Sequence, residues 1–330
     1  MPRSKIIIVT RATQLASLRQ KFNTRSQAKF QIVTAKRREL ARSAASSVNI
    51  EALAEQAFLE VDQAADQYDA AILQLRRELV FPDFDLPVQL VDRDFLPNFF
   101  FGPDDIVVTA GQDGLVANVA KYAVGLPIIA VNPDPRRIDG ILLPFSPVDA
   151  RKAVHNVLLG KAAYRDVTLA EASLDDGQKL LAFNELFIGV RSHVSARYRL
   201  SIGQRAEHQS SSGMLICTGA GSTGWLSSVV NMASSVASAF GKPVERQPVK
   251  LEWEDQRLVY VVREPFISKS SSAELVAGLL EPGSEITVES EMASNGVIFS
   301  DGVESDALEF NAGATCRVRT AAWKARLVVK

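Results

Sequence analysis

A strand and a turn meet in Asp105-Ile106-Val107-Val108-Thr109-Ala110-Gly111-Gln112-Asp113-Gly114. The apolar run is typical of a parallel strand that is covered on both faces. In the turn, two glycines let the backbone approach an anionic ligand, and Asp113 adds a carboxylate at the same point. Ordinary turns also prefer Gly and Asp. Because ligands of open α/β sheets bind where strands end, this stretch predicts both a fold and a site.

The segments around this turn alternate between strands and helices. Residues 53–79 repeat apolar side chains at helical spacing and predict one long amphipathic helix, and residues 114–124 predict a helix directly after the turn. The expected strands are residues 5–10, 30–34, 87–92, 105–109 and 127–132. This alternation predicts an α/β domain with a parallel sheet over residues 1–147.

A β-rich domain is expected over residues 148–330. It opens with a helix that Ser146 caps and Gly160 ends, and its strands are interrupted by one long helix, 222–240. Alternating runs between polar or glycine-bearing turns predict antiparallel strands. These are residues 180–188, 196–202, 213–218, 257–263, 284–289, 297–300, 315–319 and 324–329. The segment that follows the long helix, residues 242–248, is poor strand material.

The composition excludes several classes of protein. The chain has 330 residues, 47% of them hydrophobic, and a formal net charge of −1, as in ordinary soluble proteins. No apolar run approaches the roughly 20 residues of a membrane helix. Cys217 and Cys316 form no disulfide framework, and neither the cysteines nor the histidines have metal-ligand spacing. We therefore expect a cytoplasmic protein with no membrane partner and no protein-bound metal site.

Charge is distributed unevenly within the first third of the chain. Residues 1–50 carry eleven Lys or Arg and one acid, whereas residues 51–105 carry thirteen Asp or Glu and three Arg. A basic face could attract a phosphate-bearing partner. No aromatic interleaving or nucleic-acid motif accompanies it. We therefore expect two surfaces that neutralise each other, and no nucleic-acid partner.

A second glycine-rich loop is Thr218-Gly219-Ala220-Gly221-Ser222-Thr223-Gly224-Trp225, which follows an expected strand and opens the long helix. N–H groups at a helix start, together with hydroxyls, form an anion site. Its glycines also fit the G-x-G-x-x-G fingerprint of a dehydrogenase. That fingerprint requires a βαβ unit, whereas the surrounding pattern is antiparallel.

Two further motifs are shorter. Asn184-Glu185 lies inside an apolar run, where an amide and a carboxylate either read the hydroxyls of a ligand or close a strand end. Ser300-Asp301-Gly302 is typical of a hairpin turn between two strands.

Taken together, these motifs resemble the NAD kinase family. Its members carry a G-G-D-G loop in an α/β domain, then an N-E dipeptide and a T-P-T-G-S-T-A-Y segment in a β-rich domain. The loop 111–114, the dipeptide 184–185 and the loop 218–225 follow in the same order here, and the resemblance covers about residues 105–310. The order and spacing are more specific than any single motif.

The resemblance implies a kinase that transfers a phosphoryl group from ATP, or another donor, to the 2′-hydroxyl of NAD or a related nucleotide, with Mg²⁺. Asp113 matches the catalytic base. The matching substrate-binding positions are Gly111, Gln112, Gly114, Asn184, Glu185, Thr218, Gly221, Ser222 and Thr223. Gln112 stands where the family has its second glycine, and Trp225 stands in place of tyrosine. Small nucleotides and a homo-oligomeric assembly are the implied partners.

Three other functions remain open at this point. One is a nucleotide-binding sensor that has kept the pocket and lost turnover, which would bind nucleotides without phosphoryl transfer. Another is a lipid or sphingoid kinase, which shares the G-G-D-G loop but lacks a match to Asn184-Glu185. The last is a dehydrogenase, in which Gly221 would be essential and Asp113 dispensable.

Overall fold

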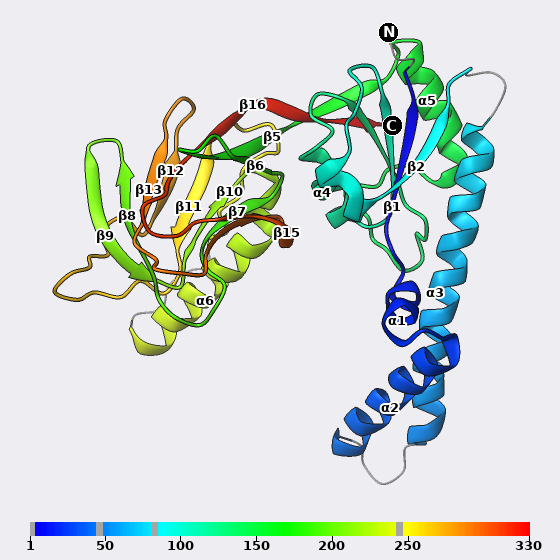
Figure 1. Ribbon diagram of the computed structural model, residues 1–330, viewed down its shortest axis with the longest axis horizontal. Helices are drawn as coiled ribbons and strands as arrows, with labels where there is room; N and C mark the ends of the chain where they lie inside the picture. The colour runs from blue at the N-terminus through cyan, green and yellow to red at the C-terminus, as the bar shows by residue number, and fades with distance from the viewer. Residues whose placement is uncertain (1–3, 44–48, 81–84, 242–246) are drawn as a thin grey trace. The chain divides into compact units, whose positions relative to one another are not determined.

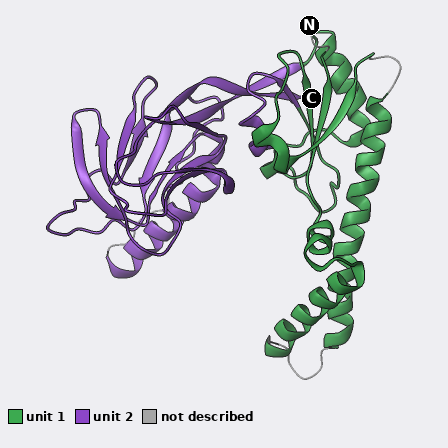
Figure 2. Ribbon diagram, viewed as in Figure 1, with its two compact units in different colours: residues 1–115, 129–162, 330 green, residues 116–128, 163–329 purple. Residues whose placement is uncertain are grey.

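The computed structural model describes residues 4–43, 49–80, 85–241 and 247–330. The chain divides into two compact units (Figure 2). Unit 1 comprises Met1–Leu115, Ile129–Ala162 and Lys330, and unit 2 comprises Val116–Ile128 and Ala163–Val329. Of the segment that we expect to be poor strand material, residues 242–246 lie outside the described residues.

A parallel sheet forms the centre of unit 1 (Figure 1). Strand β1 (Ile6–Thr10) lies between β2 (Val88–Asp92) and β3 (Ile106–Ala110) and runs parallel to both. Strand β4 (Pro127–Val131), whose last three residues belong to unit 1, is the other neighbour of β3. Almost all side chains of β1 and β3 are buried. The parallel sheet predicted from the β-α alternation is therefore confirmed.

Along the chain, three helices connect β1 to β2: α1 (Gln14–Phe22), α2 (Arg25–Ser43) and α3 (Ile50–Leu79). The long amphipathic helix is confirmed as α3, whose buried face includes Phe58 and Tyr68. Its N-terminus is capped by the Asn49 side chain, which accepts a hydrogen bond from the backbone of Ala52.

The expected strand at residues 30–34 is wrong, because these residues lie inside α2. Ala28 and Val33 of α2 pack in one cluster with Ala54 and Phe58 of α3. Burial of one helical face thus outweighs the local strand preference of the β-branched residues in this segment.

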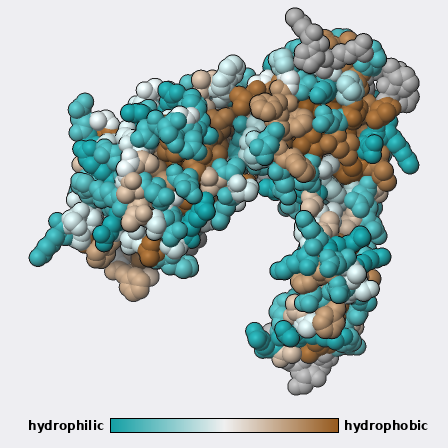
Figure 3. Space-filling model, viewed as in Figure 1, coloured by the Kyte–Doolittle hydropathy of each residue, from teal (hydrophilic) through white to brown (hydrophobic). Residues whose placement is uncertain are grey.

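Ion pairs between the basic helix α2 and the acidic helix α3 account for the uneven charge of the N-terminal sequence. The pairs join Arg25 to Asp62, Lys29 to Glu55 and Arg37 to Glu51. The surface of these helices is largely hydrophilic in Figure 3. The two charged segments therefore neutralise each other, as the charge pattern of the sequence predicts.

The remaining helices of the first half are short: η1 (Arg93–Asn98), α4 (Asp113–Ala120), η2 (Pro147–Asp149) and α5 (Ala150–Leu158). Helix α4 begins at the turn, as predicted, but ends four residues before the expected position 124. The helix expected from Ser146 forms as η2 followed by α5, and the Asp149 carboxylate accepts hydrogen bonds from the Ser146 backbone and hydroxyl.

Unit 2 contains antiparallel strands from two sheets, the 10-stranded sheet that also includes β1 to β4 and a separate 6-stranded sheet (Figure 1). In the first, β16 (Thr315–Val329), β13 (Ile286–Ser290), β8 (Ala196–Ile202) and β9 (Arg205–Ser211) follow in order, and β5 (Ala163–Leu174) joins β16 to β6 (Lys179–Ala182). The second has the order β12 (Ala277–Leu280), β11 (Leu258–Val262), β10 (Met214–Cys217), β7 (Glu185–Val190), β14 (Gly296–Ser300) and β15 (Val303–Glu309). The antiparallel prediction is confirmed.

The core of unit 2 is built by strand alternation. Leu186 and Ile188 of β7 point into the cluster shared with the first sheet, whereas Phe187 points to the opposite face. That opposite face is covered by α6 (Trp225–Phe240), through Leu226. Among the described residues, no helix combines the length and apolar character needed to cross a bilayer.

Two strand predictions differ from the structure. Residues 180–188, expected as one strand, form β6 and β7 with a break at Phe183 and Asn184. Residues 315–319 and 324–329, expected as two strands, form the single strand β16, whose pairing with β5 shifts register between positions 320 and 324.

Candidate functional site

The turn after β3 places Asp113 at the first position of α4. Its Oδ1 atom accepts a hydrogen bond from the backbone of Leu142 at 2.8 Å. Its other carboxylate oxygen has no hydrogen-bond donor among the described residues. Gln112 and Gly114 are exposed, whereas Gly111 is buried so closely that a Cβ atom there would lie 2.7 Å from the Leu115 side chain. The loop therefore presents a carboxylate with one free oxygen beside exposed backbone.

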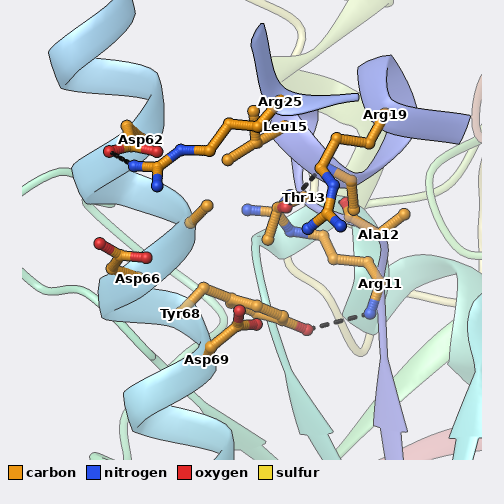
Figure 4. Close-up of a pocket in the computed structure, with 12 residues that line it drawn as sticks. Arg11, Ala12, Thr13, Leu15, Arg19, Arg25, Asp62, Asp66, Tyr68 and Asp69 are labelled. Atoms are coloured by element: carbon orange, nitrogen blue, oxygen red, sulfur yellow. Dashed lines mark hydrogen bonds and ion pairs between the residues drawn. The ribbon is translucent and has the colours of Figure 1, made fainter. Parts of the chain in front are cut away.

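Tyr68 of α3 contacts the strand end that leads into this loop, and Figure 4 shows its side chain next to Arg11. Its hydroxyl donates to the Ala110 carbonyl at 2.9 Å and accepts from the Arg11 backbone at 3.0 Å, and the Arg11 guanidinium lies 5.2 Å from the centre of its ring. Burial raises the pKa of Tyr68, which keeps the hydroxyl protonated as a donor. The ends of β1 and β3 are thereby joined through one side chain. This role of Tyr68 has no signature in the sequence, where the residue falls within the amphipathic pattern of residues 53–79.

A cavity of about 240 Å³ adjoins Arg11 and Tyr68. Its charged lining side chains are Arg11, Arg19, Arg25, Asp62, Asp66 and Asp69. Because the three arginines are matched by three aspartates, the cavity has no net charge that would select an anion or a cation.

In unit 2, the Asp301 carboxylate holds the dipeptide Asn184-Glu185. It accepts hydrogen bonds from the backbone of Phe183 at 3.0 Å, Asn184 at 2.6 Å and Glu185 at 3.3 Å. Asp301 and Gly302 have φ angles of 54° and 69° and form the two-residue turn between β14 and β15. The predicted hairpin is therefore confirmed. No sequence pattern indicates that its carboxylate also holds the backbone of a dipeptide more than 100 residues away in the chain.

The second glycine-rich loop packs directly against the same dipeptide. A Cβ atom on Gly221 would lie 2.1 Å from the Asn184 carbonyl oxygen, so only glycine fits. The Thr218 hydroxyl donates to the Phe183 carbonyl at 2.5 Å, and the Ser222 hydroxyl donates to the Gly219 carbonyl at 2.7 Å. These two hydroxyls are engaged within the protein.

The predicted site residues thus fall into two groups. Unit 2 brings together Asn184, Glu185, Thr218, Gly221 and Ser222, with Thr223 on the exposed side of the loop. Unit 1 carries Gly111, Gln112, Asp113 and Gly114.

Burial raises the pKa of two carboxyl groups in unit 2, those of Glu185 and Asp301. Glu185 is 9% exposed, and its burial, together with the nearby charge of Asp301, raises its pKa to about 7. Among the described residues, none donates a hydrogen bond to its carboxylate. Burial also raises the pKa of Asp301 to about 6, although Lys121 and the three backbone donors oppose that rise. A buried carboxyl that titrates near neutrality without a donor is the kind of group found at ligand sites.

The strand pairing next to the second glycine-rich loop does not fit the dehydrogenase fingerprint. Strand β10, which leads into Gly219, Gly221 and Gly224, is antiparallel to both of its neighbours, β7 and β11. The fingerprint therefore does not open a βαβ unit. Within the described ranges, no group of three or more His, Cys, Asp or Glu is placed to hold a metal ion.

The architecture defines a two-unit class of fold: a parallel α/β unit with a Gly-x-Asp-Gly turn, and an antiparallel unit with a glycine-rich loop. Yeast NADH kinase complexed with NADH shares this fold at a TM-score of 0.54 and 15% sequence identity, over 99% of this chain and 84% of that chain. An NAD kinase from Archaeoglobus fulgidus in complex with ATP shares it at a TM-score of 0.50 and 17% identity, over 78% of this chain and 88% of that chain.

The chain therefore has an NAD kinase-like fold. No protein-family model matches the sequence. The sequence search of curated proteins also found no match.

Proposed function

We propose that this chain is an NAD kinase-like phosphotransferase, which moves a phosphoryl group from ATP or another donor to the 2′-hydroxyl of NAD or a related nucleotide. The observation that carries the proposal is the buried Glu185 carboxylate, which no described residue satisfies and which shares a cluster with Asn184 and the glycine-rich loop. A ligand rich in hydroxyl groups would supply the missing donors.

In this proposal Asp113 is the general base. Its Leu142 contact fixes one oxygen and leaves the other to accept the proton of the 2′-hydroxyl. The hydroxyl oxygen then bonds to the terminal phosphorus of the donor as the bond between that phosphorus and its bridging oxygen breaks, and the shortened donor leaves. The exposed backbone around Gly114 suits a phosphate, because no side chain lies within 4 Å of the position of a Cβ atom there.

In this proposal Mg²⁺ binds together with the nucleotide and not at a site formed by the described residues alone. The described residues include no cluster of three or more potential ligands, and Mg²⁺ commonly binds through substrate phosphates with one or two carboxylates. When bound in this way it neutralises phosphate charge. Asp113 is the carboxylate that we propose to lie nearest to those phosphates.

The test uses the purified protein with ATP, Mg²⁺ and NAD, and measures NADP. We expect NADP to form, and Asp113→Asn to lower its rate by about 10²–10⁴-fold, because the amide keeps the Leu142 contact but accepts no proton. Asp104→Asn is the matched control, since Asp104 is exposed and makes no described contact. An unaltered rate in Asp113→Asn contradicts the proposed base.

A nucleotide-binding sensor is the second candidate, and the observation that favours it is Gln112. Its exposed side chain occupies the loop position where related kinases have a glycine, next to the proposed phosphate contacts. A sensor predicts that nucleotides raise the melting temperature of the protein while no acceptor is phosphorylated. Phosphoryl transfer to any dinucleotide contradicts it.

A further inference from the structure

Lys121, the residue after α4, belongs to unit 2, and its side chain is only 2% exposed. Its Nζ atom donates to Ser300 Oγ at 2.8 Å and to Asp306 Oδ2 at 2.8 Å. The Tyr122 hydroxyl donates to the same carboxylate oxygen. Lysine is almost never buried this deeply unless it is paired, because its charge loses its hydration. Because burial of the ammonium costs hydration free energy, we expect a specific role of Lys121 in the contacts around it.

Ser300 connects Lys121 to the candidate nucleotide site. It is fully buried, it pairs with Leu186 of β7, and it directly precedes the turn residue Asp301. The Asp301 carboxylate in turn holds the backbone of Asn184 and Glu185. A continuous series of contacts therefore runs from the buried ammonium to the dipeptide, entirely inside unit 2.

The charged and titratable groups that face Asp301 come from several elements. Lys121 favours the ionised form of Asp301, whereas Glu185 of β7 carries a like charge when it is ionised. The thiol of Cys217 on β10 has a pKa raised by burial and stays neutral. Asp306 of β15 is paired with Lys121 and Tyr122. Lys121 is thus the positive charge that offsets the burial of Asp301.

We propose that Lys121 is a positioning residue for the nucleotide site: it fixes the Ser300–Asp301 turn and keeps the Asp301 carboxylate ionised, so that Asp301 holds Asn184 and Glu185 in place. Lys121 itself contacts no substrate. The proposal rests on the proposed function, because it treats the dipeptide as the nucleotide contact. With the pKa of Asp301 already at about 6, removal of the ammonium moves it further upward, toward neutrality.

The first test measures hydrogen exchange of the amides of residues 183–185 between pH 6 and pH 8.5, after correction for intrinsic rates. It compares the parent protein with Lys121→Met and Lys121→Arg. If the pKa of Asp301 rises by about one unit, the ionised fraction of its carboxyl at pH 6 falls about fivefold. We expect the protection of the amides of residues 183–185 against exchange to fall by the same factor. At pH 8.5 we expect agreement within about twofold, because Asp301 is ionised in both proteins. Lys121→Arg retains the charge and should keep the parent profile.

Two controls separate positioning from general stability. Strand β8 (Ala196–Ile202) should exchange at the parent rate in every variant. Lys121→Met leaves the buried Asp306 carboxylate without its cation, and the single variant can fail to fold for that reason alone. The double variant Lys121→Met/Asp306→Asn removes both charges of the pair and is used in that case. Parent-like protection of residues 183–185 in a folded variant without Lys121 overturns the proposal. Failure of both variants to fold also overturns it, since Lys121 would then act on the whole fold.

The second test measures NAD binding by calorimetry at the same pH values. We expect Lys121→Met to bind about fivefold more weakly at pH 6 and with little change at pH 8.5. If the parent binds no nucleotide but the exchange result holds, the proposed function fails and the positioning of the dipeptide by Lys121 stands. If the parent binds NAD and both profiles of Lys121→Met match it, the Lys121 proposal alone fails.

Discussion

Replacing Glu185 by glutamine should make the protein more stable in alkaline solution while weakening its nucleotide site. The carboxyl has a pKa of about 7 in the folded chain, against an ordinary value of 4.5. Because the folded pKa is the higher one, the folded state retains a proton that the unfolded state loses. The stability associated with this group is therefore fully present below pH 4.5 and is lost as the pH rises through 7.

The size of this stability change follows from the difference between the folded pKa of Glu185 and its ordinary pKa. Each pH unit between them corresponds to about 1.4 kcal/mol, so ionised Glu185 lowers the free energy of unfolding by about 3 kcal/mol above pH 7. Glutamine carries no charge, and it also removes the repulsion that Glu185 exerts on Asp301. We expect Glu185→Gln to be about 3 kcal/mol more stable than the parent at pH 8.5, and nearly equal to it at pH 4.

Urea unfolding at pH 8.5 and pH 4 measures this difference. Glu207→Gln is the matched control with the opposite sign. Burial opposes the ionisation of Glu207, but hydrogen bonds from the Gln209 side chain and from the backbone of Leu275 and Glu274 outweigh it and lower its pKa. Glu207→Gln should therefore destabilise the protein at pH 8.5 and have less effect in acid. A Glu185→Gln variant that is less stable than the parent at pH 8.5, or that gains equally at both pH values, would refute the reasoning.

Other substitutions test the packing of the two loops. Gly221→Ala should cost about 1–3 kcal/mol of unfolding free energy in a denaturant titration, because its Cβ atom would lie 2.1 Å from a backbone carbonyl oxygen. Gly224→Ala is its control, since the nearest atom there is 3.5 Å away, and an equal loss in both variants would contradict the steric argument. Tyr68→Phe removes the hydroxyl that joins the ends of β1 and β3 and should cost about 1–3 kcal/mol, since it leaves a backbone group unpaired. An unchanged melting curve for Tyr68→Phe would show that water satisfies both groups.

Several features of this protein follow from the sequence by itself. Alternating strand and helix periods determine the parallel sheet of unit 1, and period-two runs with polar turns determine the antiparallel sheets of unit 2. The turn 111–114 can also be predicted from the sequence, because a buried strand, two glycines and a following helix are consecutive in the chain. These features depend on interactions between near neighbours, which local patterns report directly.

Only the tertiary structure decided the chemistry of the candidate site. Asp301 reaches the backbone of Asn184 across 117 residues, and the acidity of Glu185 arises from its burial and from the charge of Asp301. The burial of Lys121 beneath the same turn has no signature in the sequence. Hydrogen bonding, desolvation and charge act between groups that the chain brings together from distant positions, so no local pattern contains them.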